Sequence, residues 1–183
     1  MTGATAFNPD DLELLLARYT EPHTQSRPRR PPWTWAALNR DERAALARMI
    51  DVFVATYNHV YATKDTELIP PCWPRHPALA ADVAVQVWLW YFVHMDPTST
   101  PQAADEYRLR RLPGFHARLD HHLGASPGEC RRGEHPDSWR QDADAQIAKY
   151  LDVPTDPERD RRYVDLFGEL HFGFPHLNDA GQS

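Results

Sequence analysis

The sequence predicts an all-α protein: a compact bundle of about five or six helices with a central antiparallel helical hairpin. Apolar residues recur at the helical period, and no segment of useful length alternates between apolar and polar residues as a half-buried strand would. The 17 prolines, against 8 glycines, divide the chain into short segments and stand mostly at the expected starts and ends of helices. A chain of 183 residues is long enough for one domain with its own core.

The first expected helix is short and begins at Pro9. Asn8 can cap it, proline suits the first helical position, and two acidic residues follow at the positive end of the helix dipole. Residues 20–32 then contain four prolines and no apolar period. We therefore expect residues 1–32 to form a short helix and a proline- and arginine-rich arm, which is either a solvated linker or a contact for phosphate or an acidic partner. The arginines of the arm are Arg27, Arg29 and Arg30.

The second expected helix covers residues 40–62 and has the clearest pattern in the sequence. Asn39 and Glu42 form a capping box at its start. Its apolar residues keep a 3.6-residue period, and its polar residues fall largely on the other side. The apolar set is Leu46, Met49, Ile50, Phe53, Tyr57, Val60 and Tyr61. This helix should bury one face in the core of a helical domain that we expect to span residues 33–171.

Residues 77–95 and 101–123 are expected to form the hairpin. The first segment is apolar on nearly every side, which is typical of a helix at the centre of a core or in a subunit interface. A β-strand is the alternative for residues 83–93, which are rich in β-branched and aromatic side chains, but the length of the segment favours a helix. The second segment contains Pro113-Gly114, which must kink or split it, because an interior proline costs about 3 kcal/mol.

The chain after the hairpin is expected to be less regular. Residues 124–136 read as a polar loop. A further helix should end at Pro154, and a last one should begin at Pro157. Residues 172–183 contain two glycines and a proline and should be coil.

Composition excludes several classes of protein. Two cysteines cannot build a disulfide-rich scaffold, a four-cysteine zinc ribbon or a four-cysteine iron–sulfur site within one chain. The net charge of −6 argues against a general nucleic-acid coat. The N-terminus shows no secretory signal, and the most apolar segment, residues 83–95, is shorter than the roughly 20 residues that a membrane span needs. We therefore expect a cytoplasmic protein with reduced cysteines.

Two cysteine–histidine pairs flank the expected hairpin. Cys72 and His76 lie just before its first helix, and Cys130 and His135 lie just after its second. Two helices of roughly 28 and 34 Å, run antiparallel, would bring both pairs to the same end. Two thiolates and two imidazoles form a tetrahedral structural zinc set, so the sequence predicts a zinc ion that closes the base of the hairpin. The alternatives are unrelated cysteines and surface histidines, or a cysteine nucleophile paired with histidine.

A second polar cluster lies near the end of the return segment. Its members are His116, Asp120, His121 and His122. His116 and Asp120 share a helix face, and with a neighbouring histidine they could hold a carboxylate–histidine metal site. They could equally form a solvated face, or support or replace the ligands of the hairpin site.

A second basic patch, Arg108, Arg110, Arg111 and Arg118, is offset by acidic neighbours. The sequence contains no phosphate-binding glycine loop, no nucleophile elbow and no His-Glu-x-x-His motif, so we do not favour an enzyme.

The run Leu68–Pro77, Leu-Ile-Pro-Pro-Cys-Trp-Pro-Arg-His-Pro, resembles uncharacterised proteins that are common in actinobacteria and often encoded beside plasmid or integrative-element genes. The resemblance continues through residues 107–123 and the loop that contains the second cysteine–histidine pair, and it covers roughly residues 50–137. It implies a genomic setting and no mechanism.

Together these observations predict a zinc-clipped helical interaction module that acts through a protein partner or self-association, in a mobile-element or regulatory system. Two alternatives stay open. One is a small metal- or cysteine-dependent enzyme, and the other is a DNA-binding regulator that uses the arginine-rich arm, although the acidic balance does not favour nucleic acid as the main partner.

Overall fold

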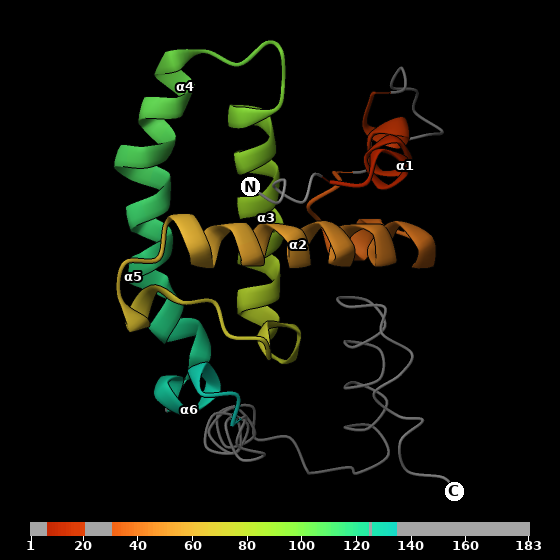
Figure 1. The fold of residues 1–183 in the computed structure, drawn as a ribbon. Coiled ribbons are helices and arrows are strands. Elements are labelled where there is room, and N and C mark those ends of the chain that lie inside the picture. Colours follow the sequence, from red (N-terminus) through yellow and green to blue (C-terminus); the bar gives the residue numbers. More distant parts are fainter. Residues whose placement is uncertain (1–6, 21–30, 125, 135–183) are drawn as a thin grey trace, which may run out of the picture.

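The computed structural model describes residues 7–20, 31–124 and 126–134, which fold into a compact all-α structure without a β-strand (Figure 1). The α-helices are α1 (Pro9–Thr20), α2 (Arg40–Val60), α3 (Pro77–His94), α4 (Pro101–Glu106), α5 (Leu112–Leu123) and α6 (Pro127–Arg131). A π-helical turn, η4 (Tyr107–Arg111), joins α4 to α5, and the shorter 3-10 turns are η1 (Trp35–Ala37), η2 (Asp65–Glu67) and η3 (Trp73–Arg75). The fold class predicted from the sequence is confirmed. The expected helices and coil beyond residue 134 and most of the arm lie outside the described residues.

The two N-terminal helices begin where their capping residues predict. The backbone N–H of Asp10 donates to Asn8 Oδ1 at 3.0 Å at the start of α1. The capping box of α2 is complete, because the Glu42 N–H donates to Asn39 Oδ1 at 3.0 Å and the Asn39 N–H donates to Glu42 Oε2 at 2.7 Å. A two-pronged ion pair then joins the helices: the Arg48 guanidinium donates to both oxygens of Asp11, at 2.6 and 2.9 Å. This contact holds α1 against α2.

Helix α3 lies at the centre of the fold, and the β-strand alternative for its residues is wrong. Figure 1 shows α2 lying across it and α4–η4–α5 running antiparallel beside it. Its first half is buried within the chain, and the Trp88 indole donates to the Pro32 carbonyl at 3.0 Å. The buried residues of α3, from Leu79 to Trp88, therefore find their partners within one chain. Even with α3 included, none of the helices within the described ranges combines the length and the hydropathy needed to cross a bilayer.

The return segment is distorted before Pro113, as the sequence predicts, and the distortion takes the form of a π turn. The Leu112 N–H donates to the Tyr107 carbonyl, five residues earlier, instead of four. A proline ring in a regular helix collides with the carbonyl four residues before it, here that of Leu109. The wider turn just before Pro113 relieves that collision, so the segment continues as one column to the base of the hairpin (Figure 1).

The expected polar loop at residues 124–136 contains a helix instead. Pro127 occupies the first turn of α6, and Glu129 lies at its positive end. The prediction was wrong because the helix has five residues and Cys130 is its single fully buried side chain, so no apolar period exists to detect.

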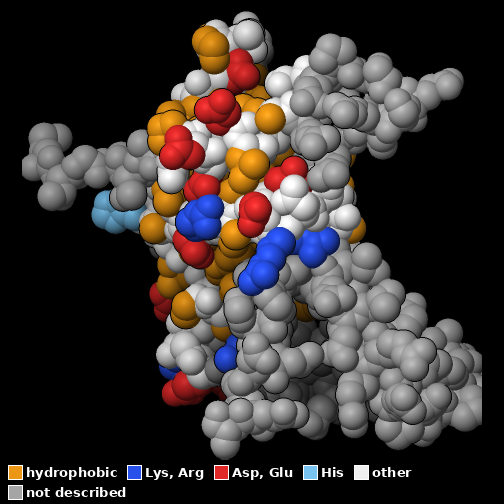
Figure 2. Space-filling model, turned by 90° about the vertical axis from the view of Figure 1, so that its right-hand side faces the viewer, with side chains coloured by type: hydrophobic (Ala, Val, Ile, Leu, Met, Phe, Trp, Pro, Cys, Tyr) orange, Lys and Arg blue, Asp and Glu red, His pale blue; other side chains and the backbone are white. Residues whose placement is uncertain are grey.

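The face on the right of Figure 1 mixes all side-chain types. Figure 2 shows acidic, basic and hydrophobic side chains interspersed over its described part. This face therefore presents no wide surface of one charge, in keeping with the mixed charges of the sequence.

Candidate metal centre

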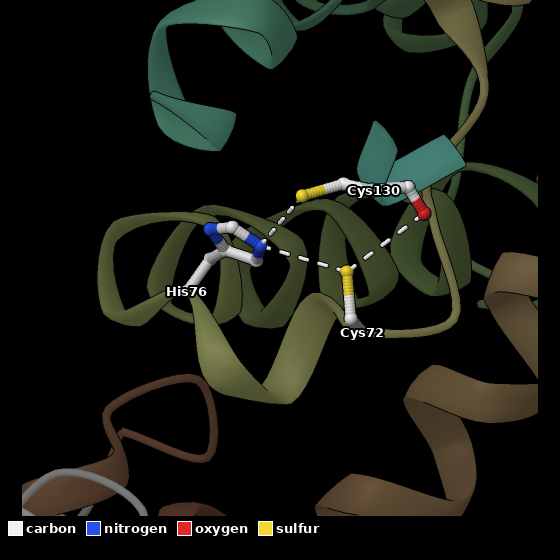
Figure 3. A group of neighbouring side chains, drawn as sticks. All are labelled: Cys72, His76 and Cys130. Atoms are coloured by element: carbon white, nitrogen blue, oxygen red, sulfur yellow. Dashed lines mark hydrogen bonds between the residues drawn. The ribbon is translucent and has the colours of Figure 1, made fainter. Parts of the chain in front are cut away.

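Three of the four residues predicted to bind zinc converge at the base of the hairpin. Figure 3 shows one nitrogen of the His76 ring directed toward the sulfur atoms of both cysteines. His76 Nε2 is 3.5 Å from Cys72 Sγ and 3.5 Å from Cys130 Sγ, and the three ligand atoms all lie within 4.8 Å of one another. The cysteines do not form a disulfide. The hairpin brings together side chains that are more than fifty residues apart.

The first two residues are fixed by a tight turn. The 3-10 turn η3 separates Cys72 from His76, and it is closed by hydrogen bonds from the Arg75 N–H to the Cys72 carbonyl at 2.9 Å and from the His76 N–H to the Trp73 carbonyl at 3.1 Å. Trp73 is buried and anchors the turn in the core. His76 is also the N-cap residue of α3, where Pro77 fixes the start of the helix. The backbone thus places both side chains on one side of the turn.

The third residue is held by its neighbour Arg131. The Arg131 guanidinium donates to the carbonyls of Thr66 at 2.7 Å and Leu68 at 3.3 Å, and it forms an ion pair with Asp120 of α5. These contacts fix α6 against both the loop before η3 and the end of the return helix. Cys130, one residue earlier, is therefore brought to the site by contacts with two separate elements.

The two sulfur–nitrogen distances of the site fit a tetrahedral zinc ion. With Zn–S near 2.3 Å and Zn–N near 2.0–2.1 Å, sulfur and nitrogen ligands of a tetrahedral site lie about 3.6 Å apart. Both Sγ–Nε2 distances in the structure are 3.5 Å. His76 and Cys130 are fully buried and Cys72 is half-buried, so a bound ion would be largely shielded from water.

Burial also controls the protonation of the site. Burial, followed by the nearby Cys130 thiol, raises the pKa of the Cys72 thiol to about 11, and Arg75 opposes the shift only weakly. Nucleophilic cysteines have lowered pKa values, so this environment does not activate Cys72 for attack on a substrate. A zinc ion would displace the thiol protons, because it binds thiolates.

The fourth predicted ligand, His135, lies outside the described residues. The chain leading to it turns back after α6: Gly133 adopts a left-handed φ of 83°, and the Glu134 N–H donates to the Glu129 carbonyl at 2.9 Å. Glycine is needed at this turn because other residues rarely adopt a positive φ.

The second predicted cluster does not converge. His116 faces Glu67, with Nδ1 3.6 Å from a carboxylate oxygen, and His122 Nε2 donates to the Asp82 carboxylate at 3.0 Å. Asp120 pairs with Arg131, and His121 is exposed. Across the described part of the chain, the hairpin site is the one group of three or more His, Cys, Asp or Glu side chains that could hold a metal. Asp120 instead supports that site through Arg131.

Asp82 is a partly buried charged residue that the sequence does not single out. It accepts hydrogen bonds from Arg118 at 2.9 and 3.1 Å and from Gln86 at 3.2 Å, besides its contact with His122. Burial alone would raise the pKa of this carboxyl, but the hydrogen bonds from His122, Arg118 and Gln86 outweigh it and lower the pKa to about 2. A lone carboxylate in an apolar helix is the signal that could have identified it.

The arginines of the predicted arm, Arg27, Arg29 and Arg30, lie outside the described residues.

Comparison with protein-family models, with curated proteins and with solved structures finds no match.

Proposed function

We propose that Cys72, His76 and Cys130 bind a structural zinc ion, with His135 as the fourth ligand, and that the zinc-clipped bundle serves as an interaction module. The observation that carries this proposal is the convergence of two thiols and one imidazole within 4.8 Å. Sulfur and imidazole ligands in a tetrahedral arrangement favour zinc over magnesium or calcium, which prefer oxygen.

The ion would act as a crosslink. It would join the turn before α3 to the short helix after α5, which are the two ends of the hairpin. Because the ligands are assembled only in the folded chain, the free energy of zinc binding adds to the free energy of folding. The metal would therefore hold the hairpin closed and fix its outer surfaces for contact with a partner.

The surroundings of the site support a structural metal over a catalytic one. A catalytic zinc keeps an open position that faces a cleft. Two of the three ligands are fully buried, and two surface hollows of the described chain are lined by other residues, from α3, α4, η4 and α5. Four protein ligands would close the coordination sphere, so the small-enzyme alternative gains no support at this site.

Zinc content of the full chain tests the proposal. The protein would be purified without chelator and analysed by plasma mass spectrometry, and we expect about one zinc ion per chain. Both thiols should resist a thiol reagent until a chelator is added. Replacing zinc with cobalt should give the intense absorption of a tetrahedral site with thiolate ligands.

Matched variants identify the ligands. Cys130→Ser should abolish stoichiometric zinc, and His135→Ala should weaken its binding strongly. His121→Ala, which changes an exposed histidine of α5, should retain zinc. Zinc near zero in the unmodified chain, with both thiols freely titratable, would overturn the proposal, and full zinc binding by His135→Ala would remove His135 from the ligand set.

A further inference from the structure

We propose that Cys72 and Cys130 are a redox pair, which a hydroperoxide converts into a disulfide with release of the zinc ion. The inference rests on the proposed metal site and names how that site would be regulated. The two cysteines are the only ones in the chain, and the fold brings them together from positions 58 residues apart. Both are free thiols in the structure. An intramolecular disulfide in this chain can therefore form only between them.

The two sulfur atoms can approach each other directly. They lie within 4.8 Å of one another, and each is 3.5 Å from His76 Nε2. Because the sulfurs are closer together than two such distances end to end, the nitrogen lies to one side of the line that joins them. A disulfide needs its sulfurs about 2 Å apart. Rotation of the thiols, with a small shift of the short helix α6, would complete the bond (Figure 3).

The two cysteines differ in access, which gives them different roles. Cys72 is half-buried, whereas Cys130 is fully buried. A small hydroperoxide therefore reaches Cys72 first, and Cys130 is placed to react with the product. Burial disfavours the Cys72 thiolate in the metal-free chain, but a zinc ion binds both sulfurs as thiolates, the form that reacts with peroxides.

The reaction is a two-electron oxidation of the thiolate pair. With hydrogen peroxide, the Cys72 thiolate attacks one oxygen, an S–O bond forms, the O–O bond breaks and hydroxide leaves, which gives a sulfenic acid. The Cys130 thiolate then attacks this sulfur, the S–S bond forms and a second hydroxide leaves. The peroxide is reduced by the two electrons that the sulfurs lose. The zinc ion keeps its charge and is released, because the disulfide no longer offers it thiolate ligands.

The disulfide would join the same two elements as the zinc ion. These are the turn before α3 and the short helix α6, so the base of the hairpin would stay closed after oxidation. Only the zinc form also engages His76 and His135. Oxidation would therefore remove the metal and free both histidines without unfolding the bundle, whereas a chelator would leave the base with no crosslink.

Peroxide treatment of the full, zinc-loaded chain tests the inference. Excess hydrogen peroxide should release about one zinc ion per chain, followed with a zinc-sensitive dye, as both thiols disappear. Peptide mapping by mass spectrometry without reduction should find Cys72 linked to Cys130. A dithiol reductant should restore both thiols and zinc binding. The oxidised chain should keep its helical circular dichroism and unfold at a higher temperature than the reduced, chelated chain.

A trapping reagent tests the order of the two steps. A cyclic 1,3-dione, which reacts with sulfenic acids, should label Cys72 and not Cys130 when it is present during oxidation of the unmodified chain. His121→Ala, which changes an exposed histidine of α5, is the matched control and should release zinc and form the disulfide as the unmodified chain does. Neither measurement depends on a cysteine variant that fails to fold.

Three outcomes would overturn the inference. These are zinc and both thiols that survive excess peroxide, oxidation of Cys72 beyond the sulfenic acid with no disulfide, and disulfides that form only between chains. Zinc content before oxidation separates the two proposals. A zinc-loaded chain that forms no Cys72–Cys130 disulfide contradicts the redox pair alone. A chain without zinc that forms this disulfide contradicts the metal and keeps the thiol pair, and a chain with neither contradicts both.

Discussion

The base of the hairpin contains two groups of polar side chains, and only one of them converges. Cys72 and His76 flank η3 and Cys130 lies on α6, and their ligand atoms lie within 4.8 Å of one another. His116, Asp120 and His122 lie within seven residues on α5, but they contact three different elements: η2 at Glu67, α6 at Arg131 and α3 at Asp82.

The difference follows from helix geometry. Successive residues of an α-helix point about 100° apart, so neighbours such as His121 and His122 cannot face one point from a single helix. Residues at the two ends of an antiparallel hairpin can, because the fold returns the chain to its starting level. For this molecule, distance in sequence was a poor guide to which residues share a site, and position relative to the hairpin was a good one.

Among the predictions that test this difference, removal of the metal should change the stability of the fold most. If zinc occupies the converging cluster, free zinc at 1,000-fold above Kd stabilises the fold by about 4 kcal/mol. Chelation, or Cys130→Ser, should remove that stabilisation and lower the Tm by roughly 8–16 °C, as calorimetry or thermal denaturation would show. Chelator should not lower the Tm of Cys130→Ser further. An unchanged Tm on chelation of the unmodified chain would show that no metal at this cysteine–histidine cluster stabilises the fold.

Asp82→Asn should cause the next largest loss of stability, because it removes the carboxylate that binds His122 of the second polar cluster. The pKa of Asp82 is lowered from 3.8 to about 2, so its ionised form stabilises the folded state. The contribution is complete above about pH 4 and is lost as pH falls through about 2. We expect a loss of about 2 kcal/mol near neutral pH, measured by urea denaturation. Asp105→Asn, at an exposed position of α4, is the control and should change stability little. A stability equal to that of the unmodified chain from pH 7 to pH 2 would show that Asp82 does not hold the helices together.

Much of the fold could be predicted because its signals are local. The capping box at Asn39 and the apolar period of α2 determine where that helix starts and which face it buries. The π turn could not be foreseen in detail. Pro113 shows that the helix must be disturbed, but whether it bends, breaks or widens depends on packing against α3. Helix α6 is too short to have a period at all.

The site was predictable to the extent that it depends on topology. The positions of Cys72 and Cys130 at the two ends of a hairpin are visible in the sequence once the helices are placed. The role of Arg131 is not, because its main acceptors are the backbone carbonyls of Thr66 and Leu68, and a carbonyl acceptor carries no residue-specific signal. His135, outside the described residues, stays a prediction.

The smallest expected effect is a difference in pH-dependent stability between variants of two histidines of α5, His116 and His121. Burial lowers the pKa of His116, and Glu67 opposes the shift only in part. Since the folded state disfavours the protonated ring, stability should fall as pH drops below about 6.5, the ordinary pKa of histidine. His116→Gln should lose this part of the pH dependence, whereas His121→Gln, at an exposed position, should keep it and change stability by less than about 0.5 kcal/mol. Denaturation of both variants and the unmodified chain between pH 5 and 8, at saturating zinc, measures the difference at each pH and cancels any shared effect of the metal. Identical pH profiles for the two variants would show that His116 is as solvated as His121, and that the contacts of the α5 histidines do not differ in energy.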